Sequence, residues 1–163
     1  MKPTYKLLTV ANGEAGIRDT LRAMSHITKA FKKSPVIREL ALKLVSSLPQ
    51  KKWFSEARKI HAFVRDRIRY VKDIRGVETL QTPVQTLRIG QGDCDDHSIL
   101  IASLLEAIGH KTRFLAIGFT PQKFTHVFPQ VNISNQWITL EATEKWKMGR
   151  GPKNIKSMLT QHN

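Results

Sequence analysis

The sequence contains a single cysteine, Cys94, among its 163 residues. A lone thiol cannot form an intramolecular disulfide, so the fold must hold without one, which agrees with a reducing compartment. No apolar run approaches the roughly 18 residues of a membrane-spanning helix. Residues 1–16 also lack the apolar stretch and small-residue cleavage site of a secretory signal. We therefore expect a cytoplasmic protein with no secretion signal and no membrane span.

Acidic residues are scarce, with 13 Asp and Glu against 27 Lys and Arg and a net charge of +14. The excess lies in residues 1–75, which carry 18 basic and 6 acidic residues, whereas residues 76–163 carry 9 and 7. A basic half attracts polyanions such as nucleic acid, anionic lipid or an acidic protein, although solvated helix faces explain the same charges. No nucleic-acid-binding motif is present, and no aromatic residues alternate with the basic ones.

Apolar residues make up 40% of the chain, enough for the core of one compact domain over residues 1–163. Spacings of three and four between apolar residues predict four helices. They cover residues 17–31, 35–48, 55–70 and 93–108. The second begins at Ser34 as N-cap with Pro35 following, and Gly109 closes the fourth.

The C-terminal half is rich in β-forming residues, which predicts strands over residues 112–119, 125–133 and 136–142. Residues 4–10 are read as a short strand or an extended arm. Residues 71–91 are predicted to be irregular, with a short helix over 84–87, and the tail after Gly149 to end loosely.

Helices followed by an antiparallel sheet indicate an α+β fold. Within it we expect a basic helical extension over residues 1–55, a core over 56–148 and a basic tail over 149–163.

The only thiol lies in GDCDDHSIL, at the predicted start of the fourth helix. Asp93 is the expected N-cap, which puts Cys94 in the first turn. The free N–H groups and the positive end of the helix dipole favour an anion there, so we expect a lowered thiol pKa. The same N–H groups can stabilise the oxyanion of a tetrahedral intermediate. A buried, inert cysteine is the alternative.

Three acids flank this thiol and would raise its pKa if they faced it. Helix positions one or two apart do not face each other, so Asp95 and Asp96 are expected to serve the helix dipole or bind elsewhere. His97 lies on the same helix and is a poor candidate for the base. A metal site formed by Asp95, Asp96, His97 and His126 matches no standard ligand spacing, so we predict no metal or cofactor.

The preferred base is His126, at the start of a predicted strand. If the last two strands form a hairpin, Glu141 can lie beside His126 and orient its ring. A cysteine, a histidine and a carboxylate in this order are the parts of a thiol acyl-transfer site. Simpler interpretations are a structural histidine and a solvent-facing acid at a strand end.

Three blocks of the sequence together resemble one family: GDCDDHSILIASLLEAIGHKTRFLAIGF, HVFPQV and WITLEAT. They are similar to the transglutaminase-like superfamily of papain-type thiol enzymes, over about residues 60–145. The resemblance implies that Cys94 is the nucleophile and His126 the base. Glu141 falls where the family usually has Asp, and Glu144 is its rival. Phage and prophage members look similar around GDCDDHS, which suggests a bacterial host cell or a phage as the setting.

The resemblance implies a cysteine-dependent enzyme acting on amide bonds of a peptide or protein, as a protease or amidase or as a transglutaminase. Hydrolysis is favoured because water is the default acceptor. The second oxyanion donor is expected from residues 71–91, where Gln81, Gln85 and Gln91 are candidates. The alternative is a non-catalytic binding module of the same fold, whose basic helices bind nucleic acid or an acidic or virion protein.

Overall fold

The computed structural model describes residues 13–72 and 79–163 of the chain. The predicted segment 4–10 and part of the 71–91 connection lie outside these ranges. The helices are α1 (Gly13–Phe31), α2 (Pro35–Val45), α3 (Trp53–Arg67), α4 (Pro83–Ile89) and α5 (Cys94–Ala107). The strands are β1 (Arg69–Tyr70), β2 (Gln91–Gly92), β3 (Lys111–Gly118), β4 (His126–Ile133), β5 (Gln136–Thr139) and β6 (Ser157–His162).

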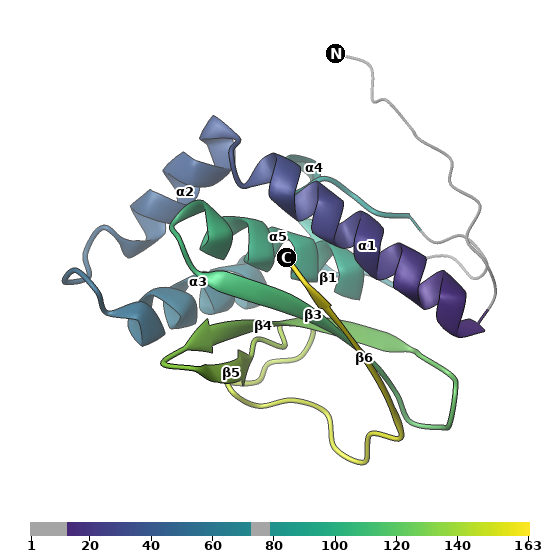
Figure 1. The fold of residues 1–163 in the computed structure, drawn as a ribbon. Helices are drawn as coiled ribbons and strands as arrows, with labels where there is room; N and C mark the ends of the chain where they lie inside the picture. Colours follow the sequence, from purple (N-terminus) through teal and green to yellow (C-terminus); the bar gives the residue numbers. More distant parts are fainter. Residues whose placement is uncertain (1–12, 73–78) are drawn as a thin grey trace.

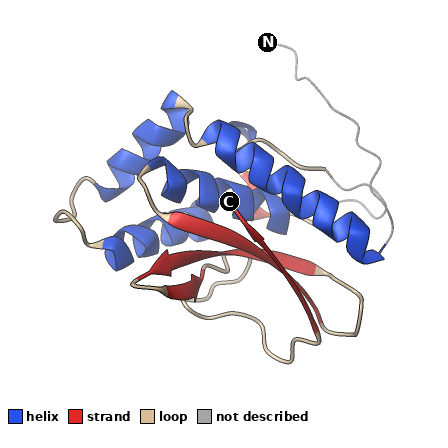
Figure 2. Ribbon diagram, in the orientation of Figure 1, coloured by secondary structure: helices blue, strands red, loops and turns tan. Residues whose placement is uncertain are grey.

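Four strands form an antiparallel sheet in the order β5-β4-β3-β6, and the helices gather over one of its faces (Figures 1 and 2). The two shortest strands, β1 and β2, form a separate parallel pair in which Tyr70 lies opposite Gly92. This arrangement confirms the predicted α+β fold with a thiol-bearing helix packed on an antiparallel sheet.

Helix α5 is the centre of the molecule, because every residue from Asp96 to Leu105 is buried. A helix that is apolar on nearly all sides needs neighbours on all sides. Residues of α2 and α3 pack against one part of it, and α1 and the sheet against another. The side chains of strand β3 alternate between the two faces of the sheet. Phe114 joins the cluster around α1 and α5, whereas Leu115 packs on the opposite face with Phe128 and Ile155.

Several predicted element ends are confirmed by the backbone. Pro35 occupies the first turn of α2 after Ser34, although the Ser34 side chain makes no capping hydrogen bond. Gly109 follows α5 with a φ of 94°, a left-handed conformation that favours glycine. The helix expected over 84–87 is longer, because Thr82 caps it and Pro83 opens it.

Three predictions need correction. Helix α3 stops at Arg67, because Ile68 turns extended and residues 69–70 pair with β2. The strand expected over 136–142 ends at Thr139. The tail does not end loosely: Ser157–His162 forms β6 along the free edge of β3, whose N–H and C=O groups it satisfies. Among the described residues, no helix is long and apolar enough to cross a membrane.

Candidate functional site

The start of α5 is held by a reciprocal capping box. The Asp93 carboxylate accepts hydrogen bonds from the Asp95 and Asp96 amides at 3.0 and 3.2 Å. The Asp96 carboxylate in turn accepts from the Asp93 amide at 3.2 Å and from the side chain of Gln81 at 2.7 Å. Asp93 is thus the N-cap, as predicted, and Asp96 binds elsewhere in the fold, also as predicted. The hydrogen bonds of the capping box use the amides of Asp93, Asp95 and Asp96 and not that of Cys94, so the Cys94 amide at the helix start can donate to another acceptor.

Cys94 is the first residue of α5, and its half-buried thiol does not have the predicted lowered pKa. Burial raises the pKa of the Cys94 thiol above its usual value, and the charges of Asp95 and Asp93 raise it further. Asp95 lies in the first turn of α5, where its charge serves the helix dipole as expected, but its carboxylate also lies 3.7 Å from the Cys94 sulfur, so the expectation that it does not face the thiol is wrong. Burial and these carboxylates therefore outweigh the favourable helix end, and the resting thiol is neutral at pH 7.

Strand β4 brings His126 to this region. A backbone hydrogen bond from Val127, the residue after His126, reaches the Cys94 sulfur. The Ser98 hydroxyl lies 2.6 Å from the Cys94 carbonyl oxygen and 3.5 Å from the Val127 carbonyl oxygen, which further joins α5 to β4. The structure therefore places the start of β4, where His126 lies, against the start of α5.

The His126 ring is hydrogen-bonded through Nε2 to the Glu141 carboxylate. Glu141 lies two residues beyond the end of β5 and is only 1% exposed. Its other carboxylate oxygen accepts from the Thr143 amide and hydroxyl, both at 2.8 Å. Burial tends to raise the pKa of the Glu141 carboxyl, but the hydrogen bonds from His126 and Thr143 outweigh it and hold the pKa below its usual value. Glu141 is thus an anion fixed against His126, whereas its rival Glu144 is exposed.

His97 occupies a structural position, as the sequence suggests. Its ring is 2% exposed and lies between the carbonyl oxygens of Asp93 and Ile68, at 2.7 and 3.1 Å. Within residues 13–72 and 79–163, no three His, Cys, Asp or Glu side chains are arranged to hold a metal ion. The alternative metal site that included His97 and His126 is therefore not assembled in these ranges.

The three glutamines named as oxyanion donors differ in their availability. The Gln81 side-chain amide donates to the Asp96 carboxylate at 2.7 Å and to the Gln91 carbonyl at 3.4 Å, so it is already engaged. Gln85 lies on α4, with its main-chain amide at the Thr82 cap. Gln91 accepts from Arg69 through its side-chain oxygen at 2.6 Å, which leaves its NH₂ group available as a candidate.

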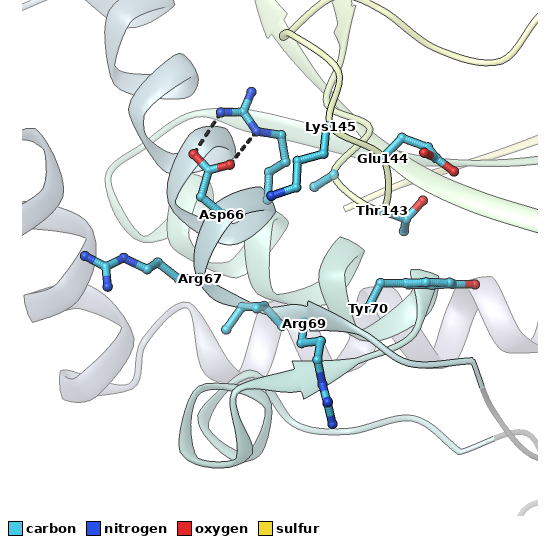
Figure 3. Close-up of a pocket in the computed structure, with 10 residues that line it drawn as sticks. Asp66, Arg67, Arg69, Tyr70, Thr143, Glu144 and Lys145 are labelled. Atoms are coloured by element: carbon cyan, nitrogen blue, oxygen red, sulfur yellow. Dashed lines mark hydrogen bonds and ion pairs between the residues drawn. The ribbon is translucent and has the colours of Figure 1, made fainter.

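A groove of about 310 Å³ lies between the end of α3 with β1 and the segment that follows Glu141 (Figure 3). Tyr70 and Thr143 lie close together in this view, whereas Arg67 and Arg69 point away from them. Burial raises the pKa of the Tyr70 hydroxyl, and the negative charge of Asp93 raises it further, so it remains a hydrogen-bond donor at neutral pH. Sequence reasoning assigned Tyr70 no role, because its pairing with Gly92 is a tertiary feature.

Comparisons with known proteins show the family and the fold of the chain. A family model described as the transglutaminase-like superfamily matches residues 38–142, more than half of the chain. The match begins in α2, earlier than the blocks that carry the resemblance. No curated protein matches the sequence.

Three solved structures share the fold. A candidate cysteine protease from Cytophaga hutchinsonii has a TM-score of 0.57 and 17% identity, over 82% of this chain and 52% of that one. A candidate protease from Parabacteroides distasonis has a TM-score of 0.60 and 15% identity, over 76% of this chain and 26% of that one. Calcium-bound LapG from Legionella pneumophila has a TM-score of 0.57 and 18% identity, over 83% of this chain and 80% of that one. The chain thus spans about half of the first protein and a quarter of the second.

Proposed function

The chain belongs to the transglutaminase-like superfamily, and from this premise we propose that it is a cysteine-dependent acyl-transfer enzyme acting on peptide or protein amides. Cys94 is the nucleophile, His126 the general base and Glu141 the group that orients His126. The observation that supports this assignment best is the hydrogen bond between the His126 ring and the buried, ionised Glu141 carboxylate. An anion there fixes the ring and stabilises the imidazolium that forms when His126 accepts a proton.

The reaction begins from a neutral thiol. His126 removes the proton as the Cys94 sulfur attacks the amide carbonyl, so a C–S bond forms and the carbonyl oxygen becomes an oxyanion. The Cys94 amide at the start of α5 donates to that oxyanion, and the Gln91 side chain and the Tyr70 hydroxyl are our candidates for a second donor. The C–N bond then breaks as His126 returns the proton to the leaving amine, which leaves a thioester.

The thioester is resolved by water, which yields an acid and regenerates the thiol with His126 again as the base. We favour water over an amine acceptor because water needs no dedicated site. The groove beside Tyr70 and Thr143 provides room next to Glu141 for a peptide segment. Protease or amidase activity is therefore the proposed outcome, and transamidation is the variant to be tested against it.

A comparison of the wild-type protein with Cys94→Ala tests this function. Both proteins are incubated with a proteome-derived peptide library, and new N-termini are identified by labelling and mass spectrometry. A parallel reaction with a fluorescent primary amine detects transamidation. New N-termini that depend on Cys94 support hydrolysis, and Cys94-dependent amine incorporation supports transamidation. If neither product depends on Cys94 while circular dichroism shows both proteins folded, the enzyme proposal fails.

A second function is favoured by the exposed basic residues of the N-terminal half, including Arg58, Lys59 and Arg67 on α3. We propose that this surface recruits an acidic partner, either nucleic acid or an acidic protein, with or without catalysis at Cys94. Binding measured by fluorescence anisotropy on a DNA duplex and on a poly-glutamate peptide should weaken steeply with salt. Charge reversal of Arg58 and Lys59 should weaken it further, and unchanged binding would rule out this surface.

A further inference from the structure

His61 is a polar residue in an otherwise apolar face of α3. Its neighbours on that face, Ala57, Ile60 and Val64, belong to the main hydrophobic cluster, and His61 itself is 1% exposed. Burial lowers the pKa of His61, so its ring is neutral at pH 7 and carries one N–H group. The sequence alone suggests no partner for this side chain.

The partner of the His61 ring is the main chain of Glu141. Nε2 lies 2.6 Å from the Glu141 carbonyl oxygen, and since a carbonyl can only accept, this nitrogen carries the proton. The Glu141 carbonyl loses its hydrogen bond to water on folding, and the buried His61 N–H replaces that bond.

The chain around Glu141 needs such an anchor because the sheet no longer holds it. Strand β5 ends at Thr139, and the last ladder-like bond runs from the Leu140 amide to the Pro129 carbonyl at 2.9 Å. From Glu141 onward the main chain leaves the sheet. Glu141 is therefore fixed at two points: Thr143 holds one carboxylate oxygen, and His61 holds the main chain. The second carboxylate oxygen remains directed at His126.

The length of the Glu141 side chain makes the anchor more important. Glutamate has one more rotatable side-chain bond than aspartate, and each rotatable bond must be ordered to present the carboxylate to His126. A small displacement of an orienting group lowers the rate strongly, because catalytic geometry tolerates only fractions of an ångström.

We infer that His61 is a positioning residue that holds the Glu141 main chain from α3 and so keeps its carboxylate against His126. This inference rests on the proposed function, because it assumes that His126 acts as the base for Cys94.

The test uses iodoacetamide as the probe, since Cys94 is the only thiol in the chain. Alkylation rates are measured by mass spectrometry between pH 5 and pH 10. The wild-type profile should show a neutral-pH shoulder from proton transfer to His126 and a separate rise at high pH from direct ionisation of the thiol. His126→Ala should remove the shoulder and retain the rise. If wild type and His126→Ala have the same profile, the proposed function fails, and the inference fails with it.

If the shoulder depends on His126, variants of His61 decide the inference. His61→Leu, which has a similar volume but no donor, should reduce the shoulder about tenfold, because a displaced Glu141 no longer holds the His126 ring in position for proton transfer. His61→Gln, whose amide can reach the same carbonyl, should recover the shoulder to within about threefold. The rise at high pH reports that the thiol remains accessible in each variant.

The contrary result would be a His126-dependent shoulder that is unchanged in His61→Leu, even if the melting temperature falls. His61 would then be a purely structural residue. Should His61→Leu fail to fold, His61→Asn replaces it, because it keeps an amide in the cavity but is too short to reach the Glu141 carbonyl. An unchanged shoulder in His61→Asn would equally overturn the inference.

Discussion

The start of α5 and the end of the β4–β5 hairpin each place a carboxylate beside a reactive side chain, with opposite consequences. Asp95 lies 3.7 Å from the Cys94 sulfur and raises the thiol pKa. Glu141 accepts a hydrogen bond from the His126 ring, and this bond helps to hold the pKa of the Glu141 carboxyl below its usual value. The same chemical group therefore opposes ionisation of the thiol on one side and fixes the imidazole ring on the other.

This difference shows where activation of the thiol must come from. A helix start is usually expected to stabilise a thiolate, but here the N–H groups of Asp95 and Asp96 already serve the Asp93 cap. In the proposed function, the helix end positions the sulfur and the Cys94 amide, whereas the sheet end supplies the base and its counter-charge. Single substitutions can change the helix side and the sheet side separately.

The largest effect is expected on the sheet side, from Glu141→Gln. The change keeps the shape of the side chain but removes the charge that stabilises the His126 imidazolium, so the turnover of a peptide substrate should fall about 10²-fold or more. Glu144→Gln is the matched control, because Glu144 lines the same groove but is exposed. It should retain activity within about twofold. Equal losses in the two variants would remove the distinction between these acids.

On the helix side, the strongest structural test is Gly92→Ala. A Cβ atom at residue 92 would lie 2.6 Å from Cβ of Asp96 and 2.7 Å from one of its carboxylate oxygens, so the capping box would have to shift. We expect a loss of about 1–3 kcal/mol in the free energy of unfolding, measured by urea denaturation. Gly151→Ala is the control for adding a methyl group outside the capping box, since its Cβ would approach a Thr139 methyl, at 3.0 Å, and not Asp96. A Gly92→Ala protein as stable as wild type would show that the box can relax.

The comparison also shows which features could be predicted from the sequence. Local patterns sufficed for α5 and its Asp93 cap, because apolar spacing and capping chemistry act within a few residues. The contact between His126 and Glu141 was predicted from hairpin topology and from the family resemblance together. Strand β6 was missed because its residues 157–162 alternate weakly, and only the open edge of β3 makes them a strand.

The electrostatics at Cys94 were predicted with the wrong sign for a physical reason. Helical spacing indicates which backbone positions share a face, but Asp95 is a first-turn residue whose side chain reaches back to the neighbouring sulfur. The extent of burial, which is the largest cause of the raised pKa of Cys94, depends on packing by Val127 and the adjoining cluster. Neither the direction of the Asp95 side chain nor the extent of Cys94 burial can be inferred from the spacing of the residues in GDCDDHS.

The smallest effect is expected from neutralising the opposing carboxylate, and it has the opposite sign to the others. Asp95→Asn removes a negative charge beside the sulfur, so the thiolate is less disfavoured and the thiol pKa falls. A unit charge at this distance contributes about 1 kcal/mol in a water-like dielectric, which corresponds to about a fivefold faster alkylation by iodoacetamide at pH 8. Asp19→Asn on α1 is the control for net charge and should not change the rate. A slower reaction in Asp95→Asn would mean that this carboxylate supports the thiol, and the contrast between the helix end and the sheet end would disappear.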